Sequence, residues 1–242
     1  MSNSQTIQPK KVSTGVVVRR VRQQAKGLVF MALWITLLFV CAGRVDWIRG
    51  WICIAVYLVG VAATGMIVHH ANHELLERRA QWQHKDTKGF DKIFLAIFFP
   101  LTVIQPAVAG LDVVRFHWSA MPSWTILPAA GLFLLAMALI TWTLATNPFA
   151  ESTVRIQSER SQSVIRSGPY AVVRHPMYVG MILMYLATGW MLGSTAALIF
   201  GIPMAVLLII RTGLEDRTLR HELPGYADYS LVTRYRLLPG IW

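Results

Sequence analysis

The stretch MYVGMILMYLATGWMLGSTAALIFGIPMAVLLII, residues 177–210, carries no charged side chain over 34 residues. A single helix of this length would measure roughly 50 Å at about 1.5 Å per residue, well beyond the ~30 Å hydrocarbon core of a bilayer. Gly193 and Ser194 lie near its middle, where a turn is expected. The run therefore predicts a helical hairpin in a membrane, with residues 177–192 crossing one way and 195–210 returning.

Four more apolar runs precede this stretch. They cover residues 27–43, 50–68, 93–111 and 124–145, and Pro100 and Pro106 are expected to kink the third. Of all residues 55% are hydrophobic and only 14% are charged, which is more apolar than a soluble domain. We therefore predict an all-α, polytopic integral membrane protein with about six transmembrane helices and polar helices at its C-terminal end.

The expected organisation has three parts. They are a basic leader (residues 1–26), a four-span membrane region (27–145) and a cofactor-binding catalytic region containing the hairpin and the tail (146–242). Cys41 and Cys53 both lie in or beside apolar runs, so neither a disulfide framework nor a thiolate metal site is expected.

The basic residues predict how the spans are oriented. Six spans leave 20 of the 23 Lys and Arg residues on one side and only Arg44, Arg49 and Arg115 on the other. By the positive-inside rule the side rich in Lys and Arg is cytoplasmic, and both termini lie there. The membrane is expected to be the plasma membrane in a bacterium or that of the endoplasmic reticulum in a eukaryote. The net charge of +11 is thereby explained without nucleic acid.

The segment SGPYAVVRHPMYVG, residues 167–180, joins a polar loop to the long apolar run. Pro169 and Pro176 favour an extended turn, and Pro176 can begin a helix. We expect open helix-N-terminal amides beside Arg174, an arrangement that suits an anion. The alternative is an ordinary loop whose Arg174 and His175 lie at lipid headgroups.

The segment EDRTLRHELPGYADY, residues 215–229, follows the hairpin. A continued helix would place Glu215, Leu219 and Glu222 on one face near the membrane surface. The alternative is a solvated helix followed by an interfacial aromatic anchor. Because a hairpin brings its own ends together, the Arg174 loop and the carboxylate pair Glu215-Asp216 are expected to face each other across a cofactor pocket.

Residues 146–242 resemble the C-terminal catalytic region of the isoprenylcysteine carboxyl methyltransferase family, which is related to the phospholipid N-methyltransferases. The matching pieces are Gly168-Pro169-Tyr170, Arg174-His175-Pro176-x-Tyr178-x-Gly180, Glu215-Asp216-x-x-Leu219, Tyr226-x-x-Tyr229 and the ending Arg234-x-Arg236-x-x-Pro239. The usual Glu-Glu pair of the family is Glu215-Asp216 here. No Gly-x-Gly-x-x-Gly unit is present, in agreement with a methyltransferase that lacks a Rossmann domain.

The resemblance implies methyl transfer from S-adenosylmethionine to a lipophilic acceptor that enters from the bilayer. The residues it implies for catalysis are Arg174, Glu215 and Arg234. Those it implies for cofactor binding are Tyr170, His175, Pro176, Tyr178, Gly180, Glu215, Asp216 and Tyr229. A carboxylate acceptor, such as a prenyl-thioether acid, would pair with Arg234 or Arg236 and needs no general base.

Other interpretations stay open at this point. They are an amine or phospholipid N-methyltransferase, a sterol-type reductase that uses NADPH, and a lipid-binding protein without catalytic activity. His69 and His73 have the i,i+4 spacing of a metal pair, but the remaining histidines are scattered, so no metal is expected. The sequence does not indicate an oligomeric state.

Overall fold

The computed structural model describes residues 14–79, 84 and 86–242. Over these residues the regular elements are helices, and no strand occurs among them, as the all-α prediction requires. The α-helices are α1 (Thr14–Ala42), α2 (Ile48–Arg79), α3 (Gly89–Gly110), α4 (Ile126–Thr146), α5 (Pro176–Leu192), α6 (Thr195–Glu222) and α7 (Tyr226–Val232). Shorter turns of helix are η1 (Leu111–Arg115), η2 (Ser123–Thr125), η3 (Ser158–Arg160) and η4 (Gly168–Ala171).

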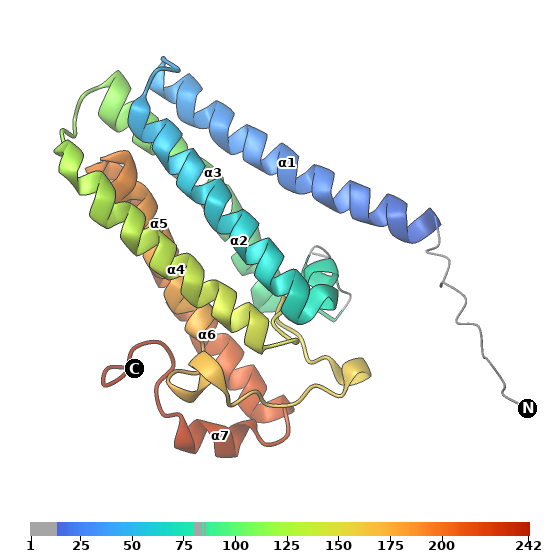
Figure 1. Ribbon diagram of the computed structural model, residues 1–242. Coiled ribbons are helices and arrows are strands. Elements are labelled where there is room, and N and C mark those ends of the chain that lie inside the picture. The colour runs from blue at the N-terminus through green and yellow to red at the C-terminus, as the bar shows by residue number, and fades with distance from the viewer. Residues whose placement is uncertain (1–13, 80–83, 85) are drawn as a thin grey trace, which may run out of the picture.

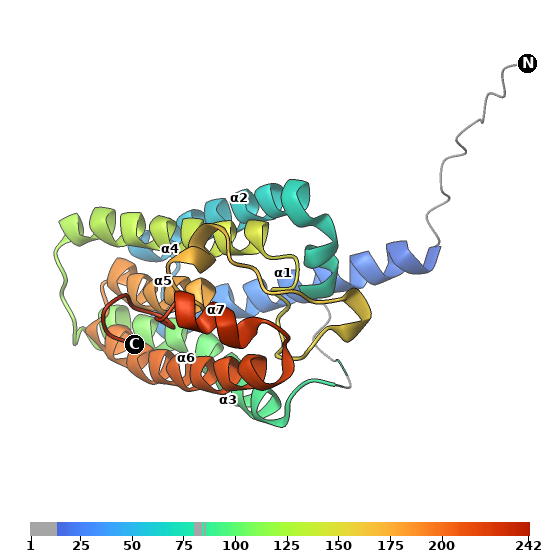
Figure 2. The same cartoon turned by 90° about the horizontal axis from the view of Figure 1, so that it is seen from below.

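Helices α1 to α6 form one bundle in which successive helices reverse direction (Figure 1). The α1–α2, η1–α4 and α5–α6 connections lie at one end of the bundle. Residues 147–175, α7 and the C-terminal tail gather at the other end, which Figure 2 shows from below. Residues 1–13 of the predicted basic leader lie outside the described residues, and residues 14–26 begin α1.

Four helical segments are long and apolar enough to cross a membrane. They are Ile48–Arg79, Gly89–Arg115, Ser123–Thr146 and Thr195–Glu222. Each leaves large apolar side chains uncovered, as Leu127 of α4 shows with 79% of its surface exposed. Such surfaces are stable where lipid replaces water, so the chain is a membrane protein. The apolar helices Gly27–Ala42 and Pro176–Leu192 are shorter, and the six-span arrangement stays a prediction.

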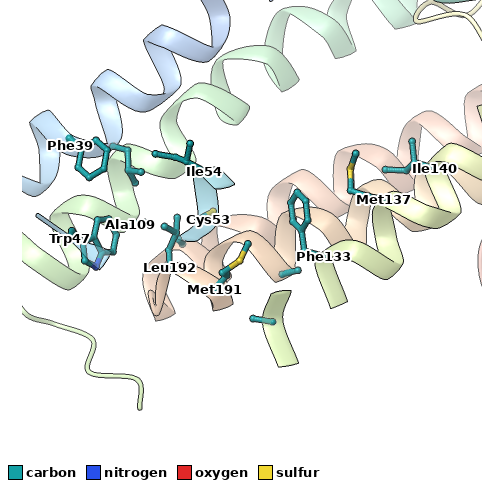
Figure 3. Close-up of a cluster of buried hydrophobic side chains, with 14 of the residues drawn as sticks. Phe39, Trp47, Cys53, Ile54, Ala109, Phe133, Met137, Ile140, Met191 and Leu192 are labelled. Carbon is teal, nitrogen blue, oxygen red and sulfur yellow. The ribbon is translucent and has the colours of Figure 1, made fainter. Parts of the chain in front are cut away.

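A continuous apolar core joins the helices, and α4 packs along α5 within it. Figure 3 shows Phe133, Met137 and Ile140 of α4 at one end of this cluster and Phe39 of α1 at the other. Phe133 and Met191 are completely buried. Close packing of this kind fixes the position of α5 along the length of α4. It thereby also positions the loop that leads into α5.

Gly180 belongs to this packing. A Cβ atom at Gly180 would lie 2.6 Å from Cγ1 of Ile140 and 3.0 Å from the carbonyl oxygen of Ala136. The absence of a side chain therefore lets α5 approach α4 closely. The structure shows this helix contact for Gly180, and its role in cofactor binding stays a prediction.

The prolines do not interrupt α3, which stays helical through Pro100 and Pro106. The interruption lies in α2 instead, at Asn72, whose backbone has φ −148° and ψ 63°. The side-chain amide of Asn72 donates to the carbonyl oxygens of Leu144, at 2.9 Å, and Ala145, at 2.6 Å. These bonds satisfy the C-terminal carbonyls of α4 and fix the direction in which the last turns of α2 continue.

The turn between α5 and α6 comprises Gly193 and Ser194. Gly193 has φ +78°, a left-handed conformation that favours glycine at the end of a helix. The Ser194 hydroxyl accepts a hydrogen bond from the backbone N–H of Ala197 at 2.9 Å and donates one to the buried carboxylate of Asp112 at 2.5 Å. Helices α5 and α6 are therefore joined tightly, and their other ends lie together at the far end of the bundle.

Candidate active site

A cavity opens where α5 begins and α6 ends. Its walls come from residues 147–165, the first turn of α5, the last turns of α6 and the start of α7. With the solvent at its mouth included, the space between these walls is about 820 Å³. The predicted site residues that line it are Tyr170, Arg174, His175, Tyr178, Glu215 and Tyr229.

Asp216 organises the groups behind this cavity. Its side chain is 1% exposed, and its two oxygens accept from Nε of Arg174 at 2.7 Å and from Nε of Arg236 at 3.0 Å. The Tyr226 hydroxyl donates to Oδ1 at 3.1 Å, and Nε2 of His175 lies 3.5 Å from the same oxygen. The Asp216 carboxylate is thus committed to protein groups and does not line the cavity, contrary to its predicted role in cofactor binding.

Arg174 is held equally firmly. Its Nε and second Nη bind Asp216, and its first Nη donates to the carbonyl oxygens of Thr233, at 2.8 Å, and Arg234, at 2.7 Å. Each guanidinium nitrogen therefore already has a protein acceptor. The predicted contact of Arg174 with a cofactor carboxylate gives way to a structural role, in which Arg174 clamps the C-terminal tail onto the turn before α5.

The backbone around Arg174 is covered as well. The N–H of Arg174 donates to the carbonyl oxygen of Tyr235, and the N–H of His175 donates to that of Arg236, both at 2.9 Å. Pro176, the first residue of α5, is buried and does not line the cavity. The tail carbonyls thus satisfy the N–H groups of the two residues that precede α5, and the predicted anion site at the helix-N-terminal amides after Pro176 stays a prediction.

Tyr178 and Glu215 form the open part of the site. The Tyr178 ring is buried and lies parallel to the His175 ring, with centroids 5.8 Å apart and planes inclined by 6°. The Tyr178 hydroxyl donates a short hydrogen bond to Oε2 of Glu215, a partly exposed carboxylate on the cavity wall. Among the described residues no cation lies within ion-pair distance of Glu215. This wall offers an aromatic surface beside an uncompensated negative charge.

Residues 129–221 match the sequence model of the isoprenylcysteine carboxyl methyltransferase (ICMT) family. This region is similar to the ICMT family. It runs from α4 to the end of α6, so it contains Arg174, His175, Tyr178, Glu215 and Asp216 and supports the resemblance seen in the sequence. Methyltransferase activity in general is the activity that this family implies.

Two curated relatives share part of this ICMT-like chain. The cobalt-zinc-cadmium resistance protein CzcN of Cupriavidus metallidurans is 33% identical over 100 residues, which cover 40% of this chain and 45% of that protein. The nickel-cobalt-cadmium resistance protein NccN of Alcaligenes xylosoxydans xylosoxydans is 29% identical over 98 residues, with 40% and 46% covered. The aligned part of the chain thus spans about half the length of the curated relatives it matches.

The ICMT-matched region does not complete the site alone. Tyr226 and Tyr229 of α7 and Arg236 of the tail lie beyond residue 221, yet Tyr226 and Arg236 bind Asp216. The Tyr229 hydroxyl donates to the carbonyl oxygen of Tyr170 at 2.7 Å, and the Tyr170 hydroxyl accepts from the Asn147 amide at 2.8 Å. Burial raises the pKa of Tyr229 to about 12 and raises the pKa values of Tyr170 and Tyr226 well above the ordinary value. These phenols therefore keep their protons at neutral pH.

Sequence reasoning missed Arg211, the first charged residue after the long apolar run. The Arg211 guanidinium lies over the rings of Phe94, at 4.5 Å, and Tyr178, at 5.3 Å. Its Nε lies 2.8 Å from Oδ1 of the fully buried Asp91, in an ion pair without the alignment of a hydrogen bond. The signal available in the sequence was the position of Arg211, one turn before Glu215.

Ion pairs also hold the loop that forms the outer wall of the cavity. Arg155 is buried and binds Glu151 at 2.8 Å, Glu159 at 2.7 Å and Asp86 at 3.0 Å. These three carboxylates together raise the pKa of Arg155 above its ordinary value, in opposition to its burial. Glu151 and Arg155 both line the cavity, so this ion-pair cluster shapes the wall opposite α6. The sequence did not single out this network, because its members are dispersed over 70 or more positions.

The structure also shows where the residues of two further sequence predictions lie. The Arg234 side chain is exposed and does not line the cavity, so its predicted catalytic role finds no geometric support. His69 and His73 meet edge to face, with ring centroids 6.3 Å apart. In the described part of the chain no group of three or more His, Cys, Asp or Glu side chains has the geometry of a metal site.

Proposed function

We propose that this protein is an S-adenosylmethionine-dependent methyltransferase that acts at the membrane interface on a lipophilic acceptor. The observation that carries the proposal is the Tyr178–Glu215 wall, which lies in the ICMT-matched region and faces a cavity at the end of the apolar helices. An acceptor with a long apolar chain can stay in the lipid while its polar end reaches this cavity.

The residues present fit the cofactor. S-adenosylmethionine combines a sulfonium, an ammonium and ribose hydroxyl groups, and Glu215 offers a carboxylate that no protein cation neutralises among the described residues. The parallel rings of His175 and Tyr178, with the Arg211 guanidinium over Tyr178, hold the Tyr178 hydroxyl in place beside Glu215. These features support cofactor binding on the side of the cavity formed by α5 and α6.

The chain's own contribution to the reaction is alignment and exclusion of water. When bound, the cofactor supplies an electrophilic methyl group, whose transfer to a carboxylate oxygen breaks one C–S bond, forms one C–O bond and needs no proton transfer. Tyr178 and Glu215 would orient the reactants, and the loop 147–165, which forms the cavity wall, would keep water away. In such a reaction most of the catalysis comes from positioning.

The acceptor class that we propose is an amphipathic carboxylic acid, such as a prenyl-thioether acid. Arg236 is bound to Asp216 and Arg234 is exposed away from the cavity, so neither supports this choice in the manner expected from the sequence. The support is the resemblance to the ICMT family, together with the position of His175, whose Nε2 lies 3.5 Å from Asp216 and 3.4 Å from the Tyr226 hydroxyl and is therefore engaged within the protein. A protonated amine would require a base, whereas a carboxylate requires none.

The test uses the purified protein with S-adenosylmethionine labelled on the methyl group and a prenyl-thioether acid as acceptor. We expect label in a lipophilic product that releases methanol on treatment with base, since an ester hydrolyses and an N-methyl group does not. A base-stable product formed on phosphatidylethanolamine would overturn the acceptor class but leave a methyltransferase. Binding of NADPH without S-adenosylmethionine would indicate a reductase, and binding of neither would indicate a lipid-binding protein.

A further inference from the structure

The charges around the cavity are nearly all matched within the protein. Arg155 pairs with Glu151, Arg174 with Asp216 and Arg211 with Asp91. Two charges next to the cavity stay unmatched among the described residues. One is the Glu215 carboxylate, and the other is the guanidinium of Arg79, the last residue of α2.

Arg79 does not line the cavity itself but contacts two residues of its wall, and it lies outside the ICMT-matched region. Its first Nη donates to the carbonyl oxygen of Ala150 at 2.5 Å and lies 3.8 Å from Sδ of Met177, and both residues line the cavity. The backbone oxygen of Arg79 accepts from the Ser152 hydroxyl at 2.8 Å, which secures the end of α2 against the loop. The break at Asn72 directs these last turns of α2 toward the loop.

Part of the Arg79 guanidinium group makes no hydrogen bond to the described residues. Its Nε and second Nη have no hydrogen-bond acceptor among the described residues, and no carboxylate of these residues lies within ion-pair distance. The nearest carboxylate that acts on Arg79 is Glu151, which is already paired with Arg155. A partly buried guanidinium without a hydrogen-bonded carboxylate favours the arrival of an anion. Arg79 also lies within electrostatic range of Tyr178, whose hydroxyl binds Glu215, so Tyr178 connects the two groups.

We infer that Arg79 and Glu215 together bind an α-amino-acid group, with Arg79 receiving its carboxylate and Glu215 its ammonium. A zwitterion of this kind neutralises both unmatched charges at once, which neither a simple anion nor a simple cation does. The inference rests on the proposed function and deepens it, because the methionine end of S-adenosylmethionine is such a group. Arg79 thereby takes the role that the sequence assigned to Arg174.

The experiment compares two ligands that differ in the amino-acid group. S-adenosylhomocysteine carries it, and 5′-methylthioadenosine does not. Both are titrated into the full-length protein in lipid nanodiscs, as the parent and as the variants Arg79→Gln and Arg79→Lys. The control is the neighbouring Arg78→Gln, because Arg78 pairs mainly with Glu74, at 2.7 Å, and approaches Glu151 of the cavity wall only at 4.0 Å.

We expect Arg79→Gln to weaken S-adenosylhomocysteine binding at least tenfold and to change 5′-methylthioadenosine binding less than twofold. Arg79→Lys should recover part of the loss, and Arg78→Gln should bind both ligands like the parent. Equal losses for both ligands, or no loss for either, would overturn the role of Arg79 while leaving the proposed function intact. A parent protein that binds neither ligand would overturn the proposed function and this inference with it.

Discussion

Asp216 connects three segments that are far apart in the sequence. Through Arg174 it holds the turn before α5, through Tyr226 it holds α7, and through Arg236 it holds the tail. Two guanidinium groups share this one buried carboxylate, and each is hydrogen-bonded to it. Removing the negative charge would leave these two cations close together without a counter-charge. One of them, Arg174, is buried and would stay so.

We therefore expect Asp216→Asn to destabilise the protein by about 3–5 kcal/mol. Asp216→Glu keeps the charge and should cost much less, which fits the Glu-Glu pair usual in the resembling family. The free energy of unfolding in mixed detergent micelles measures both. If the Asn variant unfolded within about 1 kcal/mol of the parent, Asp216 would not be the group that organises the site.

At the scale of the elements, the helices themselves could be predicted well. Charge-free runs in a membrane form helices because each backbone N–H and C=O must be satisfied within the segment. The starts of α5 and α6 and the turn at Gly193 follow from this rule and from the local Pro, Gly and Ser residues. Each of the six apolar runs is helical in the structure.

The roles of the charged residues could not be predicted in the same way. Arg174 turns inward to Asp216 and Arg234 points outward, although both belong to the motifs that resemble the family. Arg79 and Arg155 matter for the cavity, yet Ala150, which binds Arg79, and Asp86, which binds Arg155, are each about 70 positions away from them along the chain. Pairing of this kind depends on how the helices pack, which local patterns do not encode.

The contact of α4 with α5 gives a prediction for an element. A methyl group at Gly180 would overlap Ile140, so Gly180→Ala should destabilise the bundle by about 1–3 kcal/mol. Adding Ile140→Ala to that variant should recover part of the loss, because it removes the overlapping atoms. Gly131→Ala, on the exposed face of α4 with nothing within 4 Å, is the control and should be neutral. Thermal unfolding in detergent measures all of them, and equal effects at Gly180 and Gly131 would contradict the packing argument.

For the whole molecule, the two ends of the bundle differ in chemistry. The end that holds the cavity carries most of the arginines, and Arg44, Arg49 and Arg115 lie near the connections at the other end (Figure 1). By the positive-inside rule we expect the cavity to face the cytoplasm. A bacterial or eukaryotic methyl donor made in the cytoplasm would then have direct access to it.

Single-cysteine labelling tests this orientation. In a chain with Cys41→Ser and Cys53→Ala, a cysteine in place of the exposed Ala120 should react with an impermeant maleimide from outside the cell. A cysteine in place of the exposed Ser158, in the loop beside the cavity, should react only after the membrane is opened. Labelling of both from the same side would overturn the predicted six-span topology.

The central claim is that the cavity beside Tyr178 and Glu215 binds S-adenosylmethionine. Calorimetric titration of S-adenosylhomocysteine into the parent, Glu215→Ala and Glu222→Ala tests it most directly. Glu222 is the matched control, because it lies two turns further along α6 and pairs with Lys88 at 2.7 Å at the surface. We predict that Glu215→Ala weakens binding at least tenfold, or about 1.4 kcal/mol, and that Glu222→Ala binds like the parent. Equal affinity of the Glu215→Ala variant and the parent would contradict the account.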